Sequence, residues 1–250
     1  MPLHVYLLPE PVAADVVVVI DVLRFTSSAA YALAAGARSI ATCETVEQAR
    51  AVAGYRPGTL LAGERQAVKL PGFDLGNSPL EFTPAAVRGR DIAWTTTNGT
   101  RAIATALAPR RPAAPPPTER APHRDLLLAS PVNLSAVAAL LAPRLGEDAV
   151  VAVACSGREG GFALEDAACA GHLVARLRRT LGDALTMNDG ARASACIHEA
   201  YGEDFARLFR DARHGRWLRD HGFGSDLEAC GALDALEVVP RWRDGRFVAG

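Results

Sequence analysis

The sequence contains almost no lysine, and its acidic and basic residues nearly cancel. Lys69 is the single lysine among 27 basic residues, and the formal net charge of the 250 residues is -1 at pH 7. General nucleic-acid binding depends on a basic surface, so we expect no nucleic-acid partner. The arginine bias suits bidentate binding of carboxylate and phosphate groups, although a GC-rich genome produces the same bias.

Cysteine pairs and long apolar runs are also missing. The five cysteines, at positions 43, 155, 169, 196 and 230, are scattered and show no CxxC or HxxxH spacing. We therefore expect neither a zinc site nor a disulfide framework. The N-terminal segment has neither a basic start nor a long apolar span, which argues against a signal peptide or a membrane helix. The sequence predicts a soluble cytoplasmic protein with no membrane partner.

Common phosphate-binding and catalytic motifs are absent as well. The chain has no GxxxxGK(S/T) loop, no GxGxxG after its first strand and no GxSxG elbow. Cys155 does not begin a cysteine-phosphatase loop, because Arg158 stands too close to it and position 161 is glycine. We interpret Cys155 as a small packed residue at the end of a strand.

What the sequence does contain is a regular alternation of strand and helix signals, and hydrophobic residues make up 49% of it. The β-branched run Val16–Ile20 is typical of a strand buried on both faces of a parallel sheet. The other predicted strands are Leu3–Leu7, Arg38–Cys43, Thr59–Ala62, Asp91–Thr95, Leu126–Ala129, Ala149–Ala154 and a late pair at Leu236–Val239 and Arg246–Val248. The predicted helices are Ser27–Ala35, Val46–Ala53, Thr100–Leu107, Leu134–Leu145, Leu164–Leu181 and most of the chain from Asn188 onward. This order predicts one α/β domain over residues 1–250, layered α/β/α around a largely parallel or mixed sheet.

The proline-rich stretch Ala108–Arg124 interrupts this pattern. Its prolines are too closely spaced for a helix or a central strand. We interpret residues 108–124 as a surface insertion with polyproline II character. A proline-rich ligand for a partner protein is the alternative interpretation.

Polar residues gather where predicted strands give way to helices. Asp21 follows Val16–Ile20, and Arg24 and the hydroxyl residues 26–28 come next. The other polar junctions are Gly63–Arg65, Gly72–Pro79, Thr95–Arg101, Asn133 and Cys155–Gly161. A cap or a turn explains each junction alone. Because ligands of open α/β sheets bind outside the carboxyl ends of the strands, the junctions together predict a binding site there.

The side chains at these junctions favour one kind of chemistry. Carboxylates with few histidines suit Mg²⁺ rather than zinc. Several arginines in one cleft suit a small polyanion. A metal ion together with a polyanion indicates chemistry on a phosphate ester.

Six sequence blocks lie at the junctions, and several of them are long and unusual. In chain order they are VVIDVLRFTSS, AGER, GFDLGNSPLEF, TTTNGTRAI, NLSAVA and CSGREGGFALEDAACAG, and they cover roughly residues 16 to 175. They closely resemble the 2-phosphosulfolactate phosphatase family, in which they occur in the same order, and the chain looks like a bacterial member. The resemblance implies an α/β/α fold and Mg²⁺-dependent hydrolysis of (R)-2-phospho-3-sulfolactate to (R)-3-sulfolactate and phosphate, a step of coenzyme M biosynthesis. The chain departs from the family at the proline-rich insertion, at Ala129–Val132 and at Phe25, changes that would reshape the rim of the pocket.

Junction position and the implied chemistry together give the candidate site residues. Asp21, Glu64 and Asp166 are the candidate catalytic residues and metal ligands, expected to converge on one cleft. Asp74 and Glu165 are weaker candidates, because a turn or a helix dipole explains each of them. The candidate substrate-binding residues are Arg24, Arg65, Asn77, Thr97, Asn98, Gly99, Thr100, Arg101, Asn133 and Ser156.

Several alternatives stand beside these assignments. We expect Arg24 and Arg101 to clamp acidic groups of the substrate, and pairing with a neighbouring carboxylate is the alternative for each. For the nucleophile we favour a water activated by the metal over a phosphorylated Asp21, because position 23 is leucine rather than the second aspartate of a DxD arrangement.

Two other functions fit the same residues. One is a phosphatase for another small 2-phospho acid, such as phospholactate or phosphoglycolate, and the other is a non-enzymatic module that binds a small polyanion. The high apolar fraction, spread over many helices, also predicts a homodimer.

Overall fold

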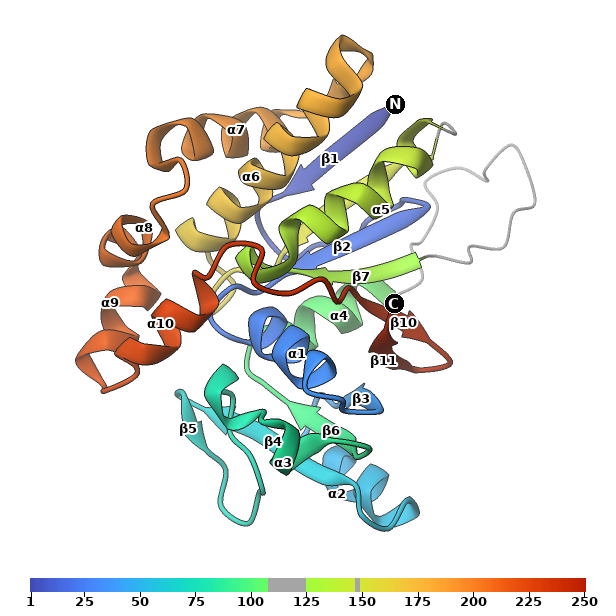
Figure 1. The fold of residues 1–250 in the computed structure, drawn as a ribbon, viewed down its shortest axis with the longest axis vertical. Helices are drawn as coiled ribbons and strands as arrows, with labels where there is room; N and C mark the ends of the chain where they lie inside the picture. Colours follow the sequence, from blue (N-terminus) through green and yellow to red (C-terminus); the bar gives the residue numbers. More distant parts are fainter. Residues whose placement is uncertain (108–124, 147–148) are drawn as a thin grey trace.

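The computed structural model describes residues 1–107, 125–146 and 149–250, and the predicted insertion at 108–124 lies outside these ranges. Within them the chain forms an eleven-stranded mixed sheet with helices on both faces, as predicted (Figure 1). The strands are β1 (Pro2–Tyr6), β2 (Val16–Ile20), β3 (Ser39–Thr42), β4 (Leu60–Arg65), β5 (Val68–Lys69), β6 (Asp91–Thr95), β7 (Asp125–Ala129), β8 (Val151–Cys155), β9 (Thr186–Met187), β10 (Pro240–Arg243) and β11 (Arg246–Ala249). The helices are α1 (Phe25–Ala34), α2 (Val46–Tyr55), α3 (Pro84–Val87), α4 (Gly99–Leu107), α5 (Leu134–Gly146), α6 (Leu164–Leu181), α7 (Asp189–Tyr201), α8 (Phe205–Asp211), α9 (Arg213–Asp220) and α10 (Gly224–Cys230), with short 3-10 turns at η1 (Pro79–Glu81), η2 (Pro131–Asn133) and η3 (Gly182–Ala184).

Strand β2 lies inside the sheet between β7 and β8 and is parallel to both. All five of its residues are buried, because helices cover both of its faces. The registers pair Ile20 with Ala129 and with Cys155, so these three strands end at the same level. Their connections into the following helices therefore meet at one edge of the sheet.

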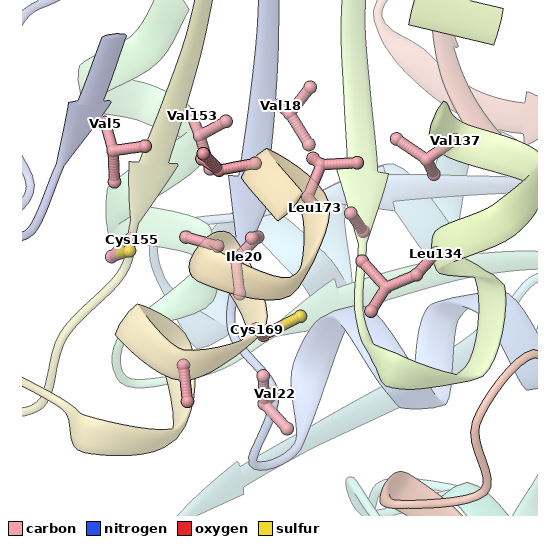
Figure 2. Close-up of a cluster of buried hydrophobic side chains, with 14 of the residues drawn as sticks. Val5, Val18, Ile20, Val22, Leu134, Val137, Val153, Cys155, Cys169 and Leu173 are labelled. Carbon is pink, nitrogen blue, oxygen red and sulfur yellow. The ribbon is translucent and has the colours of Figure 1, made fainter. Parts of the chain in front are cut away.

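Alternate residues of β2 belong to two different cores, as the pleat of a strand requires. Val16, Val18 and Ile20 pack with α5 and α6 on one face. Figure 2 shows Val18 and Ile20 of this face near Leu173 of α6. Val17 and Val19 belong to the core on the other face.

The C-terminal hairpin β10–β11 occupies the middle of the sheet. It lies between β7 and β3 and is antiparallel to both. The prediction of a strand at Leu236–Val239 is wrong, because the strand begins at Pro240. The apolar segment before it instead bonds to η2: the Leu236 N–H donates to the Val132 carbonyl at 2.8 Å.

Helix α1 begins earlier than its predicted start. Thr26 lies inside the helix rather than before it, and Ser27 and Ser28 lie inside it as predicted. Their hydroxyls donate to the backbone carbonyls of Asp21, Val22 and Asn77 at 2.9 Å each. These hydroxyl groups therefore fix the β2–α1 connection instead of facing a ligand.

Candidate active site

A cleft of about 550 Å³ opens at the carboxyl ends of the parallel strands. Its walls come from the β2–α1, β4–β5, β6–α4 and β8–α6 connections and from α9. Figure 1 shows α8, α9 and α10 gathered at the end of the sheet toward which the arrowheads of β1 and β2 point. Residues far apart in the sequence therefore surround one space.

Asp21 lines this cleft, with the carboxylates of Glu64 and Glu165 nearby, and is 6% exposed. Its backbone is fixed by Thr26, whose hydroxyl accepts from the Asp21 N–H at 3.1 Å and donates to the Asp21 carbonyl at 2.9 Å. Burial, followed by the nearby carboxylates of Glu64 and Glu165, raises the pKa of Asp21 to about 7. The carboxyl therefore gains or loses a proton near neutral pH.

Gly99 allows the close approach of α4 to Asp21. A Cβ at this position would lie 2.7 Å from Asp21 Oδ2 and 2.7 Å from Phe25 Cδ1. Phe25 is fully buried and packs edge-on against Trp94 at a ring separation of 5.2 Å, so it cannot easily yield. Position 99 therefore needs a residue without a side chain.

Asp166 in the first turn of α6 holds two connections together. Its Oδ1 accepts from the Val22 N–H at 2.9 Å, and its Oδ2 accepts from the Ser156 hydroxyl and the Gly157 N–H, both at 3.1 Å. Burial, with Asp21 and Glu165 nearby, raises the pKa of Asp166 well above its usual range. The residue supports the wall behind Asp21 and is not among the side chains that line the cleft.

Glu64 contributes a second carboxylate to the cleft itself. Its Oε1 accepts from both the N–H and the hydroxyl of Thr97 at 3.0 Å, and its Oε2 accepts from the Ala67 N–H at 2.7 Å. These bonds join the end of β4 to the β6–α4 connection. Because Glu64 is 7% exposed and oriented from both sides, its position is fixed before any ligand arrives.

Helix α9 and the residue that caps it add His214, Trp217 and His221 to the lining of the cleft. Trp217 stacks on His221 with ring centroids 4.0 Å apart. His214 Nδ1 lies 3.7 Å from the buried Glu165 Oε1. These residues were missed by sequence analysis, although their i, i+3, i+7 spacing places them on one helix face and could have indicated a shared surface.

Comparison with known proteins assigns the family. A sequence model described as 2-phosphosulpholactate phosphatase matches residues 4–245. The chain belongs to this family. A protein of Thermotoga petrophila is 37% identical over 96% of this chain and 94% of its own length, and one of Deinococcus radiodurans is 37% identical over the whole of both chains. A third, from Symbiobacterium thermophilum, is 38% identical over 96% of each chain, and all three are named probable 2-phosphosulfolactate phosphatase.

The structure brings some of the predicted site residues to the cleft of this phosphatase family member and leaves others outside it. Those that line the cleft are Asp21, Arg24, Glu64, Arg65, Asn77, Thr97 and Asn98. Those that do not line it are Gly99, Thr100, Arg101, Asn133, Ser156 and Asp166. The second group consists mainly of residues that support the connections.

Arg24 is tied to a carboxylate from a distant part of the chain. Its Nη1 donates to Asp226 Oδ2 at 2.5 Å, and its Nη2 donates to the Ala67 carbonyl at 3.0 Å. The guanidinium carbon also lies 4.5 Å from the centre of the Phe223 ring. Since Arg24 and Asp226 are 3% and 2% exposed, this is a buried ion pair that joins α10 to the β2–α1 connection.

Arg65 and Arg101 differ in their surroundings. Arg65 lines the cleft and donates to the Glu64 carbonyl at 2.7 Å and to Thr95 Oγ1 at 3.3 Å. Arg101 is exposed in the first turn of α4 and lies beside Gly160. The structure therefore places Arg101 outside the cleft wall, on the neighbouring surface.

Two of the predicted binding residues and one weaker candidate have structural partners that account for them. Asn133 accepts from the Ser130 N–H at 3.0 Å and donates to the carbonyls of Leu128 and Val238. Thr100 Oγ1 donates to the Thr96 carbonyl at 2.7 Å at the start of α4. Asp74, a weaker candidate, accepts from the Leu61 N–H at 2.8 Å, which is the expected turn contact.

Asn77 has no such partner for its side-chain oxygen. It is 6% exposed, lines the cleft, and its Oδ1 is buried without a hydrogen-bond partner in the described ranges. An acceptor left unpaired in this position is suited to a cation or to a donor on a ligand. Its carbonyl is fixed by the Ser28 hydroxyl at 2.9 Å.

The site has side chains suited to binding a metal ion, although they do not form a complete set of metal ligands in the part of the chain that the structure describes. Among the residues the structure describes, no three His, Cys, Asp or Glu side chains form a group ready to hold a metal ion. The oxygens of Glu64 and Asp166 accept bonds from N–H and hydroxyl groups. Asp21, Glu64 and Asn77 offer hard oxygens, the class that Mg²⁺ prefers, and Mg²⁺ often uses few carboxylates and several waters.

Two further expectations concern the cysteines and the membrane. Burial raises the pKa of the Cys155 thiol well above its usual range, so this residue is a packed, unreactive thiol, as the sequence suggested.

Across the described ranges, no helix has the length and apolar character needed to cross a bilayer.

Proposed function

We propose that the protein is a Mg²⁺-dependent phosphoric monoester hydrolase that converts (R)-2-phospho-3-sulfolactate to (R)-3-sulfolactate and phosphate. The family assignment supports hydrolysis of a phosphate ester, and the names of the relatives support this substrate. Within the structure, the observation that carries the proposal is the concentration of buried carboxylates around Asp21.

The carboxylates explain why a cation is needed. A cleft lined by Asp21 and Glu64, with Glu165 and Asp166 behind them, repels a phosphate dianion. A divalent cation between them would reverse this repulsion. Asp21, Glu64 and the unpaired Asn77 Oδ1 are the groups we propose to hold it, because they are oxygen donors on the cleft surface. When bound, Mg²⁺ would supply Lewis-acid polarisation of the phosphoryl oxygens.

Residues of the chain itself orient the two carboxylates of the cleft. Thr97 and the Ala67 N–H keep the Glu64 carboxylate in one orientation, and Thr26 fixes the backbone of Asp21. Trp217 of α9 adds an apolar ring to the lining of the cleft. Such preorganisation is the main contribution a protein makes to phosphoryl transfer.

The decisive experiment is phosphate release from a panel of phosphorylated hydroxy acids, with Mg²⁺ and with EDTA. We expect Mg²⁺-dependent turnover of 2-phosphosulfolactate, and Asp21→Ala and Glu64→Ala should each abolish it while the folded state persists. Faster turnover of phospholactate or phosphoglycolate would identify that compound, rather than 2-phosphosulfolactate, as the substrate. Binding of these compounds without phosphate release would establish a polyanion-binding module instead. The homodimer, the cytoplasmic location and a place in coenzyme M biosynthesis stay predictions.

A further inference from the structure

Arg158 lies in the β8–α6 connection and lines the cleft beside α9. Its side chain is 18% exposed, and its guanidinium carbon lies 5.6 Å from the centre of the Trp217 ring. Its Nη1 is buried and has no hydrogen-bond partner in the part of the chain that the structure describes. A buried charged N–H without an acceptor is unfavourable, so this position favours an acceptor supplied by a ligand.

The backbone around Arg158 is fixed on both sides. The Arg158 N–H donates to the Gly161 carbonyl at 3.0 Å, and the Gly161 N–H donates back to the Arg158 carbonyl at 2.8 Å. The preceding Gly157 donates to Asp166 Oδ2 at 3.1 Å, and the following Glu159 N–H donates to Asn98 Oδ1 at 3.2 Å. The arginine is therefore presented to the cleft from a rigid loop.

Arg158 differs from the other two arginines that line the described cleft. The guanidinium of Arg24 is committed to Asp226 and to a backbone carbonyl, and that of Arg65 to a carbonyl and to Thr95. The carboxylate nearest Arg158 is that of Glu159, 3.7 Å from Nε, and the Glu159 side chain is 63% exposed. Water screens such a contact, so it leaves the guanidinium open to a stronger partner.

The cleft holds both carboxylates and a guanidinium with an unpaired N–H. Asp21 and Glu64 supply the carboxylates, and Arg158, held against Trp217, supplies the guanidinium. The proposed substrate carries three acid groups. Its phosphate and carboxylate are attached to one carbon, and its sulfonate extends from the next. With the phosphate bound through a cation at Asp21 and Glu64, the sulfonate extends away from it on the next carbon, and Arg158 offers an N–H without a partner among the described residues.

We propose that Arg158, held against Trp217, binds the sulfonate of the substrate and selects sulfonated 2-phospho acids over those that lack this group. The inference rests on the proposed function. A sulfonate is ionised at every physiological pH and offers three acceptor oxygens, and the planar guanidinium forms directional charge-assisted bonds with such groups.

The test crosses enzyme variants with substrates. Phosphate release is measured for the wild type and for Arg158→Met on 2-phosphosulfolactate and on 2-phospholactate, in which a methyl hydrogen replaces the sulfonate. The ratio of the two kcat/KM values should fall by about 30- to 150-fold in the variant, the scale of one charged hydrogen bond. Arg158→Lys keeps the charge without the fork and should show a smaller fall in the same ratio. It also serves if Arg158→Met does not fold.

Arg207→Met is the matched control. Its guanidinium likewise lies over an aromatic ring, that of Tyr201 at 5.1 Å, but outside the cleft, so its ratio should equal that of the wild type. A change in the ratio of less than about threefold in both Arg158 variants would overturn the inference.

A binding measurement separates this inference from the proposed reaction. Calorimetric titration of the wild type with (R)-3-sulfolactate and with lactate does not depend on hydrolysis. If the wild type releases no phosphate, the proposed function fails. Tighter binding of sulfolactate that Arg158→Met removes would then still support the sulfonate contact, and equal binding of the two compounds would refute it.

Discussion

Replacing Asp21 with Asn should stabilise the metal-free protein above neutral pH. Burial and the neighbouring Glu64 and Glu165 raise the pKa of Asp21 from 3.8 to about 7. The folded state therefore holds a proton that the unfolded state has already released over this range. By linkage, the stability associated with this group is present at low pH and is lost as the pH rises through the folded-state pKa.

The size of the effect follows from the shift. One pKa unit corresponds to about 1.4 kcal/mol, so a rise of about three units is worth about 4 kcal/mol in full. At about pH 5 the folded carboxyl is still protonated, whereas the unfolded one is mostly ionised. Between about pH 5 and about pH 8 the wild type should therefore lose about 2 to 3 kcal/mol of stability relative to Asp21→Asn.

Urea unfolding in EDTA at these two pH values, followed by circular dichroism, measures the difference. Taking the difference between variant and wild type cancels the titration of groups that the substitution does not affect. Asp183→Asn, at an exposed aspartate beyond α6, is the control and should follow the wild type. Adding Mg²⁺ at the higher pH should stabilise the wild type more than Asp21→Asn. Parallel pH profiles for wild type and Asp21→Asn would refute the argument that buried charge at Asp21 opposes folding.

Four further predictions address other parts of the molecule. Gly99→Ala should lower the activity and should destabilise the protein by about 1–3 kcal/mol, because the added Cβ would meet Asp21 and Phe25. Gly54→Ala is the control and should not destabilise the protein, because its added Cβ meets nothing within 4 Å. Burial, followed by the nearby His198, lowers the pKa of His172 from 6.5 to about 4, so the folded wild type should lose up to about 3 kcal/mol of stability as the pH falls through this range. His172→Gln should reduce that loss in acid unfolding curves, and a curve parallel to that of the wild type would contradict the prediction. Asp226→Asn should cost about 3–5 kcal/mol because it leaves Arg24 buried without a counterion, and Arg24→Lys should also lower the melting temperature; an unchanged melting temperature in both would mean that the pair does not support the fold. Light scattering at micromolar concentration should show a homodimer, and a monomer would end that prediction.

Local sequence signals were enough for most of the secondary structure. The predicted strands at Val16–Ile20 and Asp91–Thr95 and the helix at Leu164–Leu181 agree with β2, β6 and α6 at both ends. Each is set by its own residues: a β-branched run, or apolar positions at helical spacing. Thr45 is likewise an N-cap, since its side chain and that of Gln48 form a capping box.

The C-terminal hairpin shows where local signals end. Its strands lie between β3 and β7, elements that precede it by more than a hundred residues. Which strands pair is decided by the packing of the whole sheet, and an apolar segment such as Leu236–Val239 can satisfy its backbone on η2 instead of forming a strand. A single sequence contains no local feature that distinguishes these outcomes.

The site divides in the same way. The position of Asp21 and Glu64 at strand ends followed from the sequence, because parallel strands deliver their carboxyl ends to one edge. Only the tertiary structure decided what each side chain does there. It paired Arg24 with Asp226, 202 residues away, and it placed Trp217 of α9 over the guanidinium of Arg158. The physical reason is that the neighbours of a residue in the sequence decide whether it forms part of a helix or a strand. Its interaction partner is decided by which buried charged groups and aromatic rings from distant parts of the chain come into contact with it.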